Sequence, residues 1–259
     1  MRLFVTTGVE WLPIKLGCSE SRRVPAQMKR SRWRFAPGLS LSVLVLGLAA
    51  YAVTDSNLEK VLAKMDETAA KFRTAQARFT WTTFNSVVNE VSGTQTGKIY
   101  FQRNGNETEM AAVIDPPDAQ QVVFSHGKIQ VYKSRMATMD VYDAGTHREE
   151  FETFLVIGFG SSGKDMLTSF DVSYSGEEKV DGTDAVKLEL VPKSDKVKQY
   201  FTKVILWINP QNGISVQQEF LQPNGDYRLA KYSDIQLGQK IPAKAFQIKP
   251  SGSTKVVTH

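Results

Sequence analysis

Cysteine is nearly absent from this chain of 259 residues, which contains only Cys18. This scarcity excludes a disulfide framework, a cysteine metal site and a thiol nucleophile in the rest of the chain. The three histidines, His126, His147 and His259, are far apart, so the sequence offers no zinc-binding spacing. The sequence also lacks a G-x-S-x-G elbow, and its acidic pairs are typical of turns or solvated surface. We therefore expect no enzyme, no metal site and no cofactor.

A positive field is missing from most of the chain, although the formal net charge is +5. Eight of the 32 Lys and Arg residues, but only two of the 27 Asp and Glu residues, lie within residues 1–52. The remaining residues therefore hold 24 basic and 25 acidic side chains. Because nucleic-acid binding depends on an excess of positive charge, we expect no nucleic-acid partner.

Residues 28–52 have the pattern of a secretory signal peptide. A basic stretch is followed by an apolar run from Leu39 to Ala50, and the segment ends in the A-x-A signature A-Y-A. The apolar run is shorter than the roughly 20 residues that a membrane-spanning helix needs. We interpret residues 1–27 as an upstream extension and residues 53–259 as the exported domain. An uncleaved anchor in the inner membrane is the alternative.

Residues 53–259 carry the signals of a single domain that is mainly β. Apolar residues at helical spacing, with a capping pair at Ser56 and Glu59, predict a helix over 57–72. Period-two segments punctuated by turns follow, without the alternation of strands and helices that a βαβ sheet requires. The clearest strand segments are 75–83, 97–103, 127–133, 184–191, 203–210, 214–222 and 227–236. We expect an α+β fold with about nine to eleven strands in a strongly curved antiparallel sheet, or unclosed β-barrel.

The stretch GFGSSGKD, at residues 158–165, spells a phosphate-binding motif. Gly158, Gly160 and Gly163 give G-x-G-x-x-G, and the letters also match G-x-x-x-x-G-K. A nucleotide site needs a βαβ setting, and a phosphate loop needs Ser or Thr after the lysine, where Asp165 stands. We therefore interpret the three glycines as a hinge. Their apolar flanks, within residues 151–170, predict a helical lid over the sheet.

Arg103 is the one charged residue that the strand patterns place beside apolar ones. It shares a strand face with Ile99 and Phe101, so its guanidinium is expected to point toward the apolar interior. Because a buried charge needs partners, we hypothesise a latch whose five donors bind backbone carbonyls of a lid, or carbonyl oxygens of a ligand. A guanidinium that snorkels outward at the strand edge is the alternative.

The ordered set of segments resembles the LolA-like family of periplasmic carriers of outer-membrane lipoproteins, within the LolA/LolB-fold lipid-binding proteins. The segments that carry this resemblance are FRTAQARFTWTT, GTQTGKIYFQR, DPPDAQQVVFSHGKIQVYKSR, DAVKLELVPK, KVILWINPQNGISVQQEF and AFQIKPSGSTKVV. The resemblance covers most of residues 57–257. Asn104 stands where the family often has proline, and His126 stands where it has aspartate.

The resemblance implies an unclosed β-barrel with a helical lid, whose apolar cavity takes the acyl chains of lipoproteins in the periplasm. The family's functional arginine falls on Arg103. The implied partners are acylated lipoproteins or lipids, an inner-membrane release complex and an outer-membrane acceptor.

We therefore predict a monomeric periplasmic chaperone that transports lipoproteins toward the outer membrane. The alternatives are an envelope-stress or regulatory sensor that binds a membrane partner, and a general lipid-binding protein. The sequence does not show which face of each strand points inward. The predicted acyl-binding residues are Arg103, Phe79, Trp81, Phe101, Val123, Leu155, Phe159, Leu206 and Phe220, and the predicted lid hinge is Gly158, Gly160 and Gly163.

Overall fold

The computed structural model describes residues 44–259 except 106, 144 and 146–155, and it describes side chains from Ser56 onward. Helix α1 (Leu44–Lys71) comes first and contains nearly all of the helix predicted over 57–72. It begins earlier than predicted, because the preceding residues are also good helix formers, and it runs without a break through the predicted cleavage site. Cleavage of the signal therefore stays a prediction. Among the described residues, no helix has the length and apolar character needed to span a membrane.

One sheet of twelve strands makes up half of the described chain. The strands are β1 (Thr74–Asn85), β2 (Glu90–Asn104), β3 (Glu107–Ile114), β4 (Gln120–Ser125), β5 (Lys128–Lys133), β6 (Thr138–Asp143), β7 (Phe170–Val180), β8 (Thr183–Pro192), β9 (Lys203–Ile208), β10 (Ser215–Leu221), β11 (Tyr227–Leu237) and β12 (Lys255–Thr258). The short helices are η1 (Ser134–Met136), α3 (Gly163–Ser169), α4 (Asp195–Lys198) and η3 (Ala243–Phe246). Helix α3 lies within residues 151–170, where the sequence predicts a helical lid.

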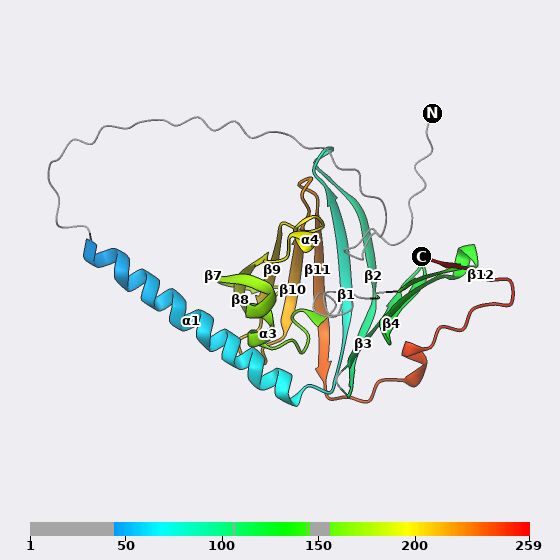
Figure 1. Cartoon of the computed structure of the whole chain (residues 1–259), viewed down its shortest axis with the longest axis horizontal. Coiled ribbons are helices and arrows are strands. Elements are labelled where there is room, and N and C mark those ends of the chain that lie inside the picture. The colour runs from blue at the N-terminus through cyan, green and yellow to red at the C-terminus, as the bar shows by residue number, and fades with distance from the viewer. Residues whose placement is uncertain (1–43, 106, 144, 146–155) are drawn as a thin grey trace.

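The sheet is antiparallel except for one pair of strands and is not closed. Its order is β12-β6-β5-β4-β3-β2-β1-β11-β10-β9-β8-β7, and only the pairing of β12 with β6 is parallel. The two ends of this order, β12 and β7, do not pair with each other. Figure 1 shows α1 beside α3 and the β7–β8 end of the sheet, where α1 packs against α3 and β7. The predicted fold class, a mainly β protein with a curved antiparallel sheet that is not closed, is confirmed.

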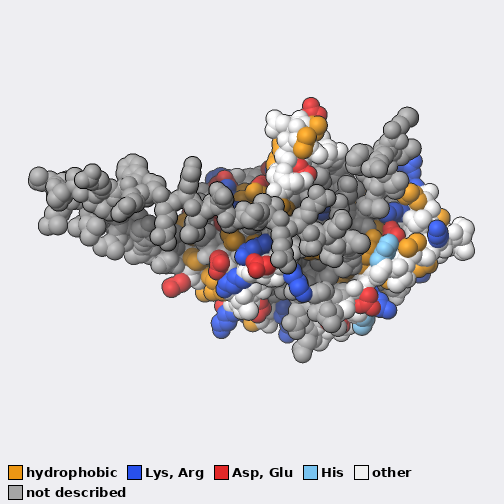
Figure 2. Space-filling view, turned by 45° about the horizontal axis from the view of Figure 1, so that its top comes forward, with side chains coloured by type: hydrophobic (Ala, Val, Ile, Leu, Met, Phe, Trp, Pro, Cys, Tyr) orange, Lys and Arg blue, Asp and Glu red, His pale blue; other side chains and the backbone are white. Residues whose placement is uncertain are grey.

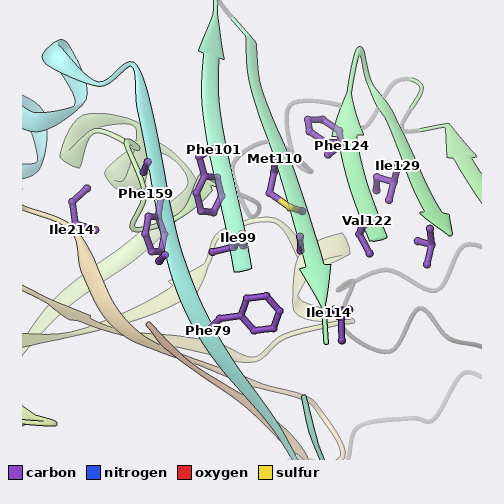
Figure 3. Close-up of a cluster of buried hydrophobic side chains, with 14 of the residues drawn as sticks. Phe79, Ile99, Phe101, Met110, Ile114, Val122, Phe124, Ile129, Phe159 and Ile214 are labelled. Carbon is purple, nitrogen blue, oxygen red and sulfur yellow. The ribbon is translucent and has the colours of Figure 1, made fainter. Parts of the chain in front are cut away.

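Two clusters of buried side chains lie on the inner face of the sheet. The first cluster covers β1 to β5 and includes Phe79, Phe101 and Phe124 (Figure 3). The second cluster lies on β8 to β10 and receives Leu62 and Met65 from α1. Strand β1 shows how the sequence produces this arrangement: Ala75, Ala77 and Phe79 are buried, while the residues between them are not. The period-two pattern of this strand therefore corresponds to one buried side and one less buried side.

The outer face of the sheet carries a smaller buried cluster and is partly covered by the C-terminal segment. Trp207, Val180, Ala185 and Val216 form a third buried cluster there. The C-terminal segment returns over β3 and β4, where η3 packs against β3 and the amide of Gln121 donates to the carbonyl oxygen of Ala245 at 3.0 Å. On the face of the molecule seen in Figure 2, lysines and arginines alternate with aspartates and glutamates. This distribution agrees with the nearly neutral composition beyond residue 52.

Candidate functional site

A short stretch, residues 156–162, passes between the two inner clusters; we call it the crossing segment. Ile157 is buried in the second cluster, whereas Phe159 is buried in the first and Val156 packs against the first. Ile157 and Phe159 are exposed by only 2% and 1%. The crossing segment precedes α3 and belongs to the lid predicted over residues 151–170. The crossing segment thus ties both halves of the inner face together.

Phe159 covers the aromatic part of the first cluster. Its ring stacks on that of Phe101, with centroids 4.7 Å apart and planes at 15°, and it meets the ring of Tyr232 edge-on at 4.7 Å. Figure 3 shows Phe159 beside Phe101 and on the same side of the sheet as Phe79 and Ile99. Aromatic pairs of this kind contribute about 0.5–1.5 kcal/mol beyond burial of their area. Phe159 therefore closes off the aromatic part of the first cluster from solvent.

Backbone carbonyls of the crossing segment are held from three directions. The side-chain amide of Gln218 donates to the carbonyl oxygen of Ile157 at 2.6 Å, and the backbone amide of Ser215 donates to that of Gly158 at 2.9 Å. Arg103 Nη2 donates to the carbonyl oxygen of Gly160 at 3.0 Å. Because buried backbone groups without partners are costly, these three contacts make the closed position of the segment stable.

Arg103 joins the crossing segment to the end of helix α1. Its Nη1 donates to the carbonyl oxygen of Ala69 at 2.8 Å, and its guanidinium lies 5.5 Å from the centre of the Phe72 ring. Ala69 lies in the last turn of α1, where unpaired carbonyls give the helix end a partial negative charge that favours a cation. The side chain is half-buried and turns toward these carbonyls. The geometry therefore fits the latch hypothesis rather than outward snorkelling.

Sequence reasoning missed the polar residues of β10 and β11 that hold the crossing segment. The hydroxyl of Tyr232 donates to Oε1 of Gln218 at 3.1 Å, which orients the amide that holds Ile157. Burial raises the pKa of Tyr232, and a hydrogen bond with Trp81 acts in the opposite direction with smaller effect. The sequence carries no signal for Gln218, because β10 also contains the polar residues Ser215, Gln217 and Glu219.

The three predicted hinge glycines lie at points of close approach. Gly158 and Gly160 have φ values of +78° and +84°, which favour glycine, and a Cβ on Gly160 would lie 2.6 Å from the Phe72 ring. A Cβ on Gly163 would lie 2.8 Å from the side chain of Leu62 in α1. These glycines are thus required for the packed position itself, and their role as a hinge stays a prediction.

The predicted apolar acyl-binding residues fall into both inner clusters, with two exceptions. Phe79, Trp81, Phe101 and Phe159 belong to or pack against the first cluster, and Leu206 and Phe220 to the second. Leu155 lies outside the described residues.

Val123 faces the other way, so its prediction as a lining residue is wrong. Its neighbours Val122 and Phe124 point into the first cluster, and Val123 pairs with Ala111 on the opposite face of the sheet. Both Val123 and Ala111 are buried, as is Ala245 in the C-terminal segment. Both faces of β4 are covered, so Val122, Val123 and Phe124 are all apolar. The sequence therefore does not reveal which of these three side chains point inward.

Within the described part of the chain, no three His, Cys, Asp or Glu side chains are grouped to hold a metal ion. The GFGSSGKD stretch leads into α3, which is followed by β7, and β7 pairs with β8 in antiparallel fashion. This setting differs from the βαβ unit that a dinucleotide fingerprint requires.

Comparisons with known proteins give fold-level likenesses. A family profile described only as that of an uncharacterized protein matches residues 161–250, which is less than half of the chain. No curated protein matches the sequence.

Several solved structures do match. An uncharacterized conserved protein from Thermus thermophilus is 12% identical, with a TM-score of 0.48, over 78% of this chain and 98% of its own. A LolA superfamily protein from Nitrosomonas europaea is 16% identical, with a TM-score of 0.36, over 73% and 97%. The complex of MucA and MucB from Pseudomonas aeruginosa matches at 14% identity and a TM-score of 0.44, over 74% of this chain but 61% of that one. A LolA superfamily protein is thus among the solved structures that match this chain.

Proposed function

We propose that this protein binds acyl chains on the inner face of its sheet and carries lipoproteins through the periplasm toward the outer membrane. The observation that supports this proposal is the clamp on the crossing segment. One arginine, one glutamine and one backbone amide hold a glycine-bearing segment by its carbonyls, above a face of fully buried apolar side chains. Contacts to backbone carbonyls can be released without unpacking the rest of the sheet.

The energetics of opening are compatible with ligand binding. Displacing Phe159 forfeits about 1.5–3 kcal/mol of burial, and releasing three hydrogen bonds costs about 1 kcal/mol each. An acyl chain that buries ten methylene groups gains about 8 kcal/mol. A single chain of ordinary length therefore offsets the cost of opening the crossing segment. In this mechanism Arg103 stabilises the closed form and its release accompanies loading.

A regulatory sensor that binds a partner at the inner membrane is the second candidate. The observation in its favour is the continuity of α1, which runs from Leu44 into the domain without a break. If the segment before the domain is retained as an anchor, the domain stays at the membrane and contacts a partner there. Capture of a membrane protein, instead of acylated cargo, by the tagged protein in cells would support this candidate. Neither role requires catalysis, and we propose that the protein is not an enzyme.

The proposal is tested by identifying what the protein holds when it is purified gently from the periplasm. Native mass spectrometry and lipid extraction should find acylated species bound to the wild-type protein. In cells, Arg103→Leu should load cargo but retain or release it abnormally. Lys98→Leu is the matched control, because Lys98 lies on the same strand with its side chain on the other face. Lipid-free protein, together with unchanged lipoprotein sorting by Arg103→Leu, would contradict the proposal.

A further inference from the structure

A second arginine lies on the inner face, in the row nearest the hairpin turn between β10 and β11. Arg228 of β11 is directly opposite Phe220 of β10 and Thr83 of β1. Two residues further along β11, Ala230 is opposite Trp81, and two further still Tyr232 is opposite Phe79. Because Phe79 and Trp81 belong to the first inner cluster, Arg228 shares the inner face with them.

The surroundings of Arg228 on this face are apolar. Phe220 packs against the second cluster and lies 5.3 Å from the ring of Phe201. The Nε atom of Arg228 is buried, whereas the residue as a whole keeps partial exposure. The aliphatic stem therefore lies along the apolar face. Arg228 lies between the two clusters, near the end of β11 at which the β10–β11 hairpin turns.

The acidic residue nearest in sequence, Asp226, is engaged in closing that hairpin. It accepts hydrogen bonds from the backbone amide of Ser86 at 2.7 Å, from the Ser86 hydroxyl at 2.8 Å and from the Asn224 amide at 2.8 Å. The hydrogen bond from the Ser86 amide is the largest cause of the lowered pKa of Asp226, and the charge of Arg228 is the smallest. A guanidinium carries five N–H donors and a permanent positive charge, which is the chemistry that binds a carboxylate or phosphate.

Arg103 and Arg228 lie at opposite ends of the inner face. The amide of Arg103 bonds to Arg73 just before β1 begins, whereas Arg228 is opposite Thr83 near the end of β1. Ten residues of strand separate these points, which is about 33 Å along β1. Arg103 is engaged with the carbonyls of α1 and the crossing segment. The two cations therefore have separate surroundings and separate tasks.

We infer that Arg228 binds the anionic head group, carboxylate or phosphate, of an acyl lipid whose chain lies on the inner face beside Phe220 and Phe201. This inference rests on the proposed function, because it assumes that an acyl chain occupies the face, and it adds the charge of the ligand. A carboxylate or phosphate suits arginine because the planar guanidinium can bind two oxygens at once. The apolar chain would leave the head group at the rim, where water still reaches it.

The test compares a fatty acid with its own methyl ester. Oleate and methyl oleate are titrated against the full exported protein at about pH 8, where the carboxyl is ionised, by competition with an apolar fluorescent probe. Wild-type protein should bind oleate about tenfold to a hundredfold more tightly than the ester, which is the effect of a hydrogen bond to a charged group. Arg228→Gln should remove this preference by weakening oleate alone, and Arg228→Lys should keep part of it.

Lys231→Gln is the matched control. Lys231 lies on the same strand but on the outer face, where it pairs with Asp181 at 3.0 Å, so its loss should leave the preference unchanged. Lysophosphatidate and lysophosphatidylcholine, used in the same way, distinguish a phosphate head group from a carboxylate. Circular dichroism shows that each variant is folded.

Four outcomes would overturn the inference. Equal affinity of the wild type for the acid and the ester would do so while acyl binding itself stands. The inference would also be overturned if Arg228→Gln kept the preference for oleate over methyl oleate, or if Lys231→Gln removed that preference. Failure of both acid and ester to bind would contradict the proposed function as well as the inference, and so is distinguishable from the other results.

Discussion

Gly160→Ala tests whether the crossing segment is packed against Phe72 as tightly as the structure shows. The backbone at Gly160 has φ = +84°, and a Cβ there would lie 2.6–2.8 Å from three atoms of the Phe72 ring. The positive φ costs an alanine about 1–2 kcal/mol. Crowding of a packed site costs a further 1–3 kcal/mol, roughly, because the ring belongs to a filled cluster and cannot move freely. The reduced entropy of the unfolded chain returns about 0.4–1 kcal/mol.

Gly182→Ala supplies a matched control for the backbone strain alone. Gly182 lies in the turn between β7 and β8 with φ = +85°, nearly the same angle as at Gly160, and a Cβ there meets no atom within 4 Å. We expect Gly182→Ala to lower the free energy of unfolding by about 1 kcal/mol. Gly160→Ala should lower it by about 2–4 kcal/mol, since the crowding is added. The difference between the two variants isolates the contact with Phe72.

Urea unfolding followed by circular dichroism measures both variants. The slope of the transition reports whether the native state has changed its compactness, and the midpoint reports stability. Equal losses for the two variants would show that the crossing segment yields to the new methyl group without strain. That result would refute the tight closed position on which the latch argument depends.

Three further predictions concern the clamp. Gln218→Leu leaves the buried carbonyl of Ile157 without its donor and should lower the free energy of unfolding by about 1–3 kcal/mol. The control Gln217→Leu, on the outer face, should lower it by less than about 0.5 kcal/mol. Equal losses in urea unfolding would contradict the role of Gln218 as the donor to Ile157. Arg103→Leu should cost about 2 kcal/mol and speed hydrogen exchange at residues 157–160 more than elsewhere, and uniform exchange would argue against a latch. Burial raises the pKa of Tyr232, so the stability that this side chain contributes is fully present below about pH 10 and is lost at higher pH. Above about pH 10 the free energy of unfolding should therefore fall less steeply with pH for Tyr232→Phe than for the wild type. Identical slopes would contradict the burial argument.

Strands with one covered face were the predictable part of the fold. In β1 the alternation of Ala77 and Phe79 with polar neighbours identified the strand and the side that its apolar residues share. The same reasoning placed Arg103 on the face of Ile99 and Phe101, which the structure confirms. Period two is visible in a sequence whenever water lies on one side and a core on the other.

Strands covered on both faces were the part that the sequence obscured. Residues 109–112 of β3 are buried without interruption, and so are residues 122–124 of β4, because the C-terminal segment packs behind them. Alternation disappears in such strands, which is why Val123 was assigned to the wrong face. Ser215 and Gln218 could not be found either, because their role depends on a segment nearly 60 residues away in sequence.

Site-specific photocrosslinking to an acyl chain tests the central claim most directly. Benzoylphenylalanine is placed at Trp81, which packs at the inner face, or at Thr82, the next residue of β1, whose side chain lies on the outer face. The protein is then irradiated with an alkyne-tagged palmitate. Binding of the chain on the inner face predicts a crosslink from position 81 and none from position 82. Equal labelling at both positions, or labelling at position 82 alone, would contradict an acyl-binding inner face.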